Sequence, residues 1–300
     1  MSGIIGLDEY EAFSSIEAIY PLIDPSAVFA SRAFKGRVVL ITGASGGIGR
    51  SISMFYARAG ADLVLVSRTL ENLKAGEVEI LKEVPGARIE LVDVDVVHPD
   101  SGTEAVKRTI AVFGRLDILV ANAGIPSAPH APLAEKDPLH WWCTQEVNVR
   151  GVFVFIHSAL PELVKRKGQI VITSSAVAHL RVPGSSDYII SKHAVNRLAE
   201  LVSLEYPDVK VYSVHPGVVA SQQAREAATS FPAIDPPELM AATAMWLTMR
   251  NAEFLSGRFI NATWDLNEVV AKKDEVVREN LLVTKLARPA RESSDLSGAS

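Results

Sequence analysis

The chain has little cysteine, and that shortage excludes several kinds of site. Cys143 is the single cysteine among 300 residues, so neither an intrachain disulfide nor a cysteine-cluster metal site can form. We expect Cys143 to be a buried helix thiol rather than a nucleophile. One unpaired thiol suits a reducing compartment, and we predict a cytoplasmic protein without a metal site.

Positive charge and long apolar runs are also scarce. The net charge is −5 and the isoelectric point is about 5.8, which argues against a nucleic-acid partner. No apolar run approaches the roughly 20 residues that cross a bilayer. Acidic residues stand near the start (Asp8, Glu9, Glu11), where a signal peptide would be basic. We therefore predict neither a nucleic-acid nor a membrane partner.

Hydrophobic residues, 48% of the chain, gather in short runs of Val, Ile and Leu that alternate with helical patterns. Such runs are typical of parallel strands buried on both faces. The β-α alternation predicts an α/β fold: a single Rossmann-like, doubly wound parallel sheet of about seven strands with right-handed crossovers. The expected strands lie at or within 37–42, 62–67, 87–94, 116–121, 170–173, 209–214 and 257–261.

The two ends of the chain fall outside this alternation. In residues 1–34, apolar side chains recur at roughly helical spacing until Pro21 and Pro25 interrupt them. We predict a short helix and an extended arm there, lying on the main domain or on a partner subunit. Residues 35–265 form the main domain. Residues 266–300 are expected to form an amphipathic helix and then a disordered tail.

A glycine-rich turn joins the first expected strand to the first helix. Its positions of interest are Gly43, Ser45, Gly47, Ile48 and Gly49. Glycines let a backbone approach a pyrophosphate and aim N–H groups at it. Glycine spacing alone also fits a plain tight turn, but a strand before and a helix after favour a dinucleotide cradle.

The end of the second strand, Ser67-Arg68-Thr69, indicates which dinucleotide binds. In such folds an acid there holds the ribose 2′-hydroxyl, whereas an arginine accommodates a 2′-phosphate. Arg68 is present and no acid is. A charge-assisted hydrogen bond contributes about 1.5–3 kcal/mol, or about 10–100-fold in affinity. We therefore predict NADP(H) in preference to NAD(H); the alternative is a surface arginine that caps the next helix.

Tyr188 and Lys192 lie four residues apart on an expected helix, so their side chains share one face. A free tyrosine has a pKa of about 10, and an ammonium within about 4–6 Å can lower it by roughly 1–3 units. The pair can therefore serve as a tuned acid/base. Ser175, at the end of the fifth strand, could hold a substrate oxygen. Alone, this spacing also fits an ordinary surface helix.

Taken together, these motifs resemble the short-chain dehydrogenase/reductase family over about residues 35–262. The resemblance rests on four features: the Thr-Gly-x-x-x-Gly-x-Gly turn at 42–49, Asn122-Ala123-Gly124, Pro216-Gly217, and Asn148, Ser175, Tyr188 and Lys192 in the order and spacing of the family's catalytic tetrad. The chain departs from the pattern at Ala262-Thr263-Trp264-Asp265, where Val-Asp-Gly-Gly is common, and in its added arm and tail.

The resemblance implies a role for each motif. Tyr188 would be the general acid in ketone reduction and the base in alcohol oxidation, and Lys192 would lower its pKa and bind the nicotinamide ribose. Ser175 would orient the substrate oxygen, and Asn148 would hold a water that links Lys192 to solvent. Cofactor contacts are implied for Asp95, Val96, Asn122, Ala123, Gly124, Pro216, Gly217, Val219 and Ser221.

The expected function is interconversion of a ketone or aldehyde with an alcohol by hydride transfer, acting on a small molecule. The resemblance also implies a homodimer or homotetramer. Two alternatives remain open: non-redox chemistry on the same fold, as in a cyclase, epimerase or dehydratase, and a non-catalytic NADPH-binding protein. Residues 179–182 and a lid at 222–235 are the expected substrate walls.

Overall fold

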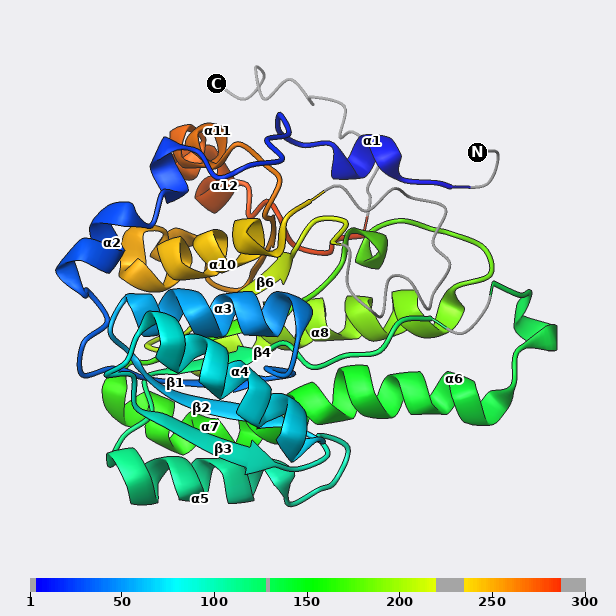
Figure 1. Ribbon diagram of the computed structural model, residues 1–300. Helices are drawn as coiled ribbons and strands as arrows, with labels where there is room; N and C mark the ends of the chain where they lie inside the picture. Colours follow the sequence, from blue (N-terminus) through cyan, green and yellow to red (C-terminus); the bar gives the residue numbers. More distant parts are fainter. Residues whose placement is uncertain (1–3, 128–129, 220–234, 287–300) are drawn as a thin grey trace.

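The computed structural model describes residues 4–127, 130–219 and 235–286. Within these ranges the core is a sheet of seven parallel strands in the order β3-β2-β1-β4-β5-β6-β7 (Figure 1). The strand order reverses between β1 and β4, which confirms the predicted doubly wound α/β fold. The strands are β1 (Val38–Thr42), β2 (Asp62–Ser67), β3 (Ile89–Asp93), β4 (Ile118–Ala121), β5 (Gln169–Thr173), β6 (Lys210–His215) and β7 (Arg258–Asn261).

Helices cover both faces of the sheet (Figure 1). Along β1, Val39 and Ile41 face one hydrophobic core and Val38 and Leu40 face the other. This burial on both sides explains why the strands are apolar throughout rather than alternating. One face carries α3 (Gly47–Arg58), α4 (Leu70–Glu83) and α10 (Pro237–Trp246); the other carries α5 (Ser101–Phe113), α7 (Gly151–Arg166) and α8 (Ser186–Glu205).

One long helical segment, Pro138–Arg166, combines α6 (Pro138–Gln145), the π-helical turn η3 (Glu146–Arg150) and α7. Asp137 caps its start by accepting a 3.0 Å hydrogen bond from the Leu139 N–H. By length and composition the segment is apolar enough to cross a membrane, although half of its most apolar window is buried in the protein. A core helix of a soluble protein meets the same criterion, so this feature is weak support for a membrane span.

The N-terminal arm is more extended than its spacing predicted. Among the described residues before Pro21, only Leu7–Tyr10 (α1) is helical, and η1 (Pro21–Ile23) and α2 (Ser26–Ser31) follow. Between them the backbone pairs with the segment after β7: the Ile16 N–H donates to the Thr263 carbonyl at 2.6 Å, and the Asp265 N–H donates to the Ser14 carbonyl at 2.8 Å. These tertiary backbone bonds replace those of the expected helix.

Two other expectations need correction. Cys143 is exposed on α6, because the face of that helix that carries it points to solvent. The helix expected after residue 265 is two short helices, α11 (Leu266–Ala271) and α12 (Lys273–Arg278). Short 3₁₀ turns lie at η2 (Leu133–Glu135), η4 (Ala176–Ala178) and η6 (Glu253–Leu255), and a second π-helical turn, η5 (Leu247–Asn251), follows α10.

Candidate active site

The four tetrad residues meet near the carboxyl ends of β4 and β5. Ser175 follows β5, and its side chain is hydrogen-bonded to that of Tyr188 on α8. The Lys192 ammonium lies 5.6 Å from the centroid of the Tyr188 ring. A Cβ added to Gly124 would lie 3.2 Å from Asn148 Oδ1 and 3.5 Å from Lys192 Nζ, so both polar groups border this glycine.

Burial sets the ionisation of this pair. It raises the pKa of the Tyr188 hydroxyl, and the hydrogen bond from Ser175 opposes that rise. Burial also lowers the pKa of Lys192 to about 8. The net direction of the Tyr188 pKa shift is therefore opposite to the one expected from the sequence, because loss of hydration outweighs the hydrogen bond from Ser175. Lys192 donates to the Thr173 carbonyl at 2.8 Å, which ties its head group to β5.

Asn148 lies in the π-helical turn η3 and is fully buried. Its Oδ1 accepts from the Ile125 N–H at 2.8 Å, and its Nδ2 donates to the Ile125 carbonyl and to Ser191 Oγ, both at 3.0 Å. The side chain thus fastens the segment after β4 to α8 beside Tyr188. π-Helical turns occur often at functional sites. The water held by Asn148 stays a prediction.

The glycine turn has the shape that a pyrophosphate cradle needs. Gly43 and Gly47 have φ of +66° and +50°, a region that side chains with a Cβ rarely adopt. A Cβ at Gly49 would lie 2.1 Å from the Gly43 carbonyl oxygen. Arg50 stabilises the turn by donating a hydrogen bond to the Ser45 carbonyl at 2.7 Å. Ser45 and Ile48 are half-buried, while Gly47 is exposed. These residues fit a bound dinucleotide.

Asn122 holds three strand ends together. Its Nδ2 donates to the Thr42 carbonyl at 3.2 Å, and Thr173 Oγ1 donates to its Oδ1 at 3.0 Å. The backbone N–H groups of Asn122 and Ala123 both donate to Thr42 Oγ1 at 3.0 Å. Asn122 therefore holds the carboxyl ends of β1, β4 and β5 in place relative to one another.

The residues expected to surround the adenosine lie together at the ends of β2 and β3. Ser67 Oγ donates to the Thr69 carbonyl at 3.2 Å, which closes a tight turn around Arg68. Arg68 is exposed and forms no ion pair with any residue that the structure describes. Asp95 Oδ1 accepts from the Val97 N–H, and Val96 is buried against Gly151.

The segment after β6 is held by Asp235, a contact that could not be predicted from the sequence. Asp235 Oδ2 accepts from the Val218 N–H at 2.6 Å, and Val219 forms a parallel bridge with Asp235. Gly217 has φ +87°, and a Cβ there would lie 2.6 Å from Asp235 Oδ2. Pro216 and Val219 follow β6, and the cofactor contacts expected of them stay predictions. Ser221 and residues 222–234 of the expected lid lie outside the described residues. No local signal marks Asp235, because its partner is backbone.

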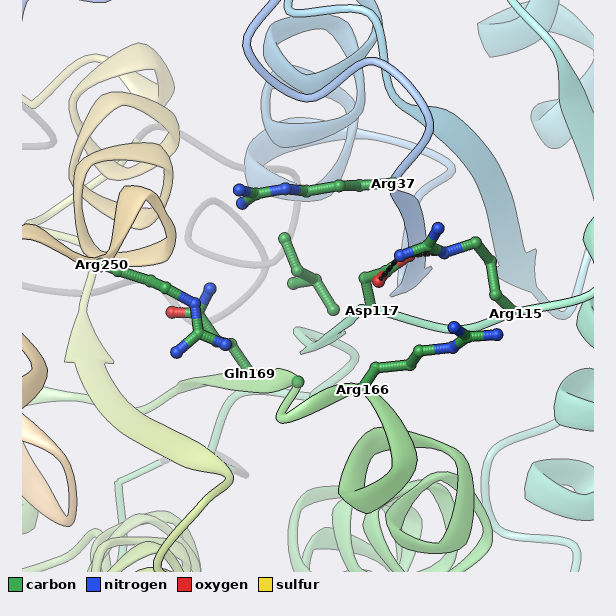
Figure 2. A pocket seen from close by; sticks show the side chains of 8 residues that line it. Arg37, Arg115, Asp117, Arg166, Gln169 and Arg250 are labelled. Atoms are coloured by element: carbon green, nitrogen blue, oxygen red, sulfur yellow. Dashed lines mark hydrogen bonds and ion pairs between the residues drawn. The ribbon is translucent and has the colours of Figure 1, made fainter.

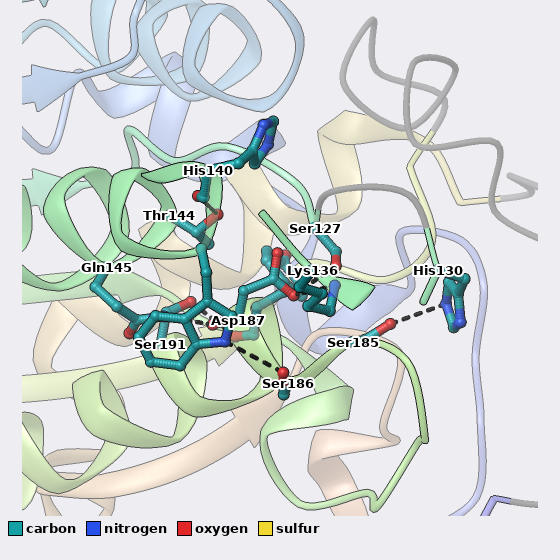
Figure 3. Close-up of polar contacts among 12 residues, drawn as sticks. Ser127, His130, Lys136, His140, Thr144, Gln145, Ser185, Ser186, Asp187 and Ser191 are labelled. Atoms are coloured by element: carbon teal, nitrogen blue, oxygen red, sulfur yellow. Dashed lines mark hydrogen bonds and ion pairs between the residues drawn. The ribbon is translucent and has the colours of Figure 1, made fainter. Parts of the chain in front are cut away.

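A buried ion pair beside Tyr188 was also missed. Lys136 Nζ lies 3.1 Å from Asp187 Oδ1, and their side chains are 3% and 0% exposed (Figure 3). Ser127 Oγ donates to the same carboxylate at 2.7 Å, and Gln145 Nε2 donates to the Asp187 carbonyl at 2.8 Å. The carboxylate joins the segment after β4 to the first turn of α8, so it fixes the start of the helix that carries Tyr188.

Residues 179–182, which are expected to line the substrate pocket, contact other parts of the protein. Asn196 Nδ2 is paired with His179 Nε2 at 3.0 Å, and the His179 ring centroid lies 4.4 Å from that of Phe259. Arg181 pairs with Ile5 of the arm through two backbone hydrogen bonds, of 3.2 and 2.9 Å. The arm therefore holds the loop that follows Ser175, a contact that the sequence did not reveal.

Residues 37–230 match the family model described as short chain dehydrogenase. The chain belongs to the short-chain dehydrogenase family. A curated relative, the short chain dehydrogenase mpl6 of Monascus purpureus, is 37% identical over 273 residues, covering 87% of this chain and 92% of that protein. This membership confirms the resemblance seen in the sequence.

Two solved structures share the fold. Levodione reductase superposes with a TM-score of 0.72 at 26% identity, covering 76% of this chain and 96% of that one. An alcohol dehydrogenase from the archaeon Thermococcus sibiricus, complexed with 5-hydroxy-NADP, gives 0.64 at 27% identity and covers 75% and 95% of the two chains. The family supports an oxidoreductase that uses a nicotinamide cofactor.

Proposed function

We propose that this short-chain dehydrogenase interconverts a ketone or aldehyde with an alcohol, using NADP(H). The observation that carries the proposal is the Ser175–Tyr188 hydrogen bond with Lys192 beside the ring, next to a glycine turn shaped for a dinucleotide. NADPH, when bound, supplies the hydride that reaches the carbonyl carbon. The protein supplies the proton and holds the substrate in place.

The buried site suits proton donation by Tyr188. Because burial raises its pKa, the hydroxyl stays protonated at neutral pH and can give its proton to the oxygen of a carbonyl that receives hydride. Ser175 would hold that same oxygen by a hydrogen bond. Lys192, bonded to the Thr173 carbonyl, would face the nicotinamide ribose. Alcohol oxidation would run through the same groups in reverse and would start from the deprotonated Tyr188, which takes the proton of the alcohol.

Arg68 would select NADP(H) through the 2′-phosphate. The described residues leave its guanidinium exposed and without an ion pair, at the strand end where the adenosine ribose lies in dinucleotide folds. Arg68→Gln should raise the Kd for NADPH by about 10–100-fold and that for NADH by under about threefold. Fluorescence titration of both cofactors measures this. Lys74→Gln, at an exposed cation on α4, is the matched control; an equal loss for both cofactors would rule out the 2′-phosphate role.

We further propose a homodimer formed through α6 and α7. Trp142 on α6 and Phe153 and Val164 on α7 are 63%, 49% and 44% exposed, so this helical segment presents several large apolar side chains to solvent. Exposed apolar side chains of this kind mark association surfaces. Light scattering should give twice the chain mass for the wild type and the chain mass for Phe153→Asp. Val78→Asp, at an exposed apolar position on α4, should stay dimeric; a monomeric wild type would refute the proposal.

A further inference from the structure

The loop between Ser175 and Tyr188 connects the end of β5 to the first turn of α8. Each of its ends carries a candidate catalytic residue, so the loop passes beside the place where a substrate oxygen would bind. The middle of the loop, at Arg181, pairs with Ile5 of the N-terminal arm through two backbone hydrogen bonds. The arm is therefore placed to influence the substrate site, although it lies far from that site in the sequence.

Gly6 lies directly against this loop. A Cβ added to Gly6 would be 3.0 Å from Arg181 Nη2 and 3.2 Å from the His179 carbonyl oxygen. The φ of Gly6 is +96°, in the left-handed region that residues with a side chain rarely adopt. The arm can approach the loop this closely because a glycine stands at that position.

A few residues further along, the arm contacts the edge strand β7. The Asn261 side-chain amide donates to the Tyr10 hydroxyl at 2.6 Å, and the Tyr10 ring centroid lies 6.3 Å from that of Phe259. The Phe259 ring in turn packs against His179 of the loop, with 4.4 Å between the ring centroids. Residues 5–10 of the arm therefore join the middle of the loop to β7.

The two ends of the loop have anchors of their own. Beside Ser175, the backbone N–H of Ser174 donates to a carbonyl of β6 at 2.8 Å. Beside Tyr188, the buried ion pair of Lys136 and Asp187 fixes the start of α8 (Figure 3). The hydrogen bond between Ser175 and Tyr188 should therefore persist when the arm is loosened.

We propose that residues 5–10 of the arm set the affinity for the carbonyl substrate by holding the middle of this loop, with Gly6 as a positioning residue. This inference rests on the proposed function. Because the two ends of the loop are anchored independently, a loosened arm should weaken substrate binding and leave the hydride-transfer step nearly unchanged. The KM for the substrate should therefore rise while kcat is kept.

The test compares Gly6→Val with Gly114→Val in the full-length protein. A β-branched side chain at the positive φ of Gly6 is strained and meets the loop. Gly114 has φ +74°, and a Cβ added there would meet no described atom within 4 Å, so this control adds similar strain without the contact. It lies before β4, at the end of the sheet opposite the site, where Figure 2 shows its neighbour Arg115 paired with Asp117.

Hydrogen exchange followed by mass spectrometry measures the contact itself, without cofactor or substrate. The Arg181 amide, which donates to the Ile5 carbonyl, should exchange about fivefold faster in Gly6→Val than in the wild type. Its exchange in Gly114→Val should match that of the wild type. Equal exchange in all three proteins would overturn the claim that the arm holds the loop.

Initial rates with NADPH and a panel of ketones and aldehydes that includes acetophenone, cyclohexanone and benzaldehyde measure the consequence. With the compound that the wild type reduces fastest, Gly6→Val should raise KM about fivefold, while kcat and the Kd for NADPH change by under about twofold. Gly114→Val should match the wild type in all three quantities.

An unchanged KM in Gly6→Val, or a loss confined to kcat, would refute the substrate role of the arm while leaving the proposed function in place. A wild type that oxidises NADPH with no member of the panel would remove the proposed function and the substrate role together. The exchange experiment would then still decide whether the arm holds the loop.

Discussion

Tyr188→Phe is expected to lower kcat by about 10²–10⁴-fold, the usual contribution of a positioned acid or base. The Kd for NADPH should change by under about threefold, because the ring still fills its place beside Lys192. The variant removes only the hydroxyl that is hydrogen-bonded to Ser175. Rapid-quench or absorbance assays at the reduced nicotinamide band measure the first quantity and fluorescence titration the second.

The control for this variant is Tyr206→Phe. Tyr206 lies just after α8 and takes no part in the site, so its loss of a hydroxyl should leave kcat unchanged. Turnover that survives in Tyr188→Phe would remove Tyr188 from the proton-transfer step. A large loss of NADPH affinity would instead assign the hydroxyl to cofactor binding.

Lys136→Met should cost about 3–5 kcal/mol of unfolding free energy, the usual result of removing one partner of a buried ion pair. Both side chains are almost fully buried, and no solvent is at hand to hydrate the Asp187 carboxylate. Ser127 still donates to that carboxylate, but a hydroxyl does not neutralise its charge. Chemical denaturation monitored by circular dichroism gives the free energy directly.

A double variant separates charge from packing in this test. Lys136→Met combined with Asp187→Leu removes both charges and should recover most of the lost stability, because an apolar pair needs no hydration. Lys165→Met, which breaks the exposed pair with Glu162, should cost under about 1 kcal/mol. A loss in Lys136→Met no larger than that of Lys165→Met would show that the buried pair adds nothing.

The sheet could be predicted closely from the sequence because buried parallel strands need unbroken apolar runs. Residues 62–67 match β2 without change, and 37–42 differ from β1 by one residue. The arm could not be predicted, because its spacing is helical while its backbone pairs with distant residues. Trp264, where the family pattern has glycine, packs its ring 5.1 Å from that of Phe13, and that contact depends on the whole fold.

In the site, too, local sequence patterns could be predicted and contacts between distant residues could not. Gly43, Gly49 and the Tyr188–Lys192 spacing are local signals, and each kept its expected place. Asp187 and Asp235 carry no local signal, since one pairs with a lysine 51 residues away and the other with a backbone N–H 17 residues away. The direction of the net pKa shift of Tyr188 could not be predicted from the sequence either, because burial is a property of the folded protein.

The most direct test of the proposed function follows the hydride itself. Purified protein is incubated with NADPH deuterated at C4 and a panel of ketones and aldehydes, and the products are analysed by mass spectrometry. The account predicts at least one alcohol with a single deuterium on its carbinol carbon, and none with Tyr188→Phe at the same enzyme concentration. Tight NADPH binding without any deuterated alcohol, or with a product formed and no cofactor oxidised, would contradict it.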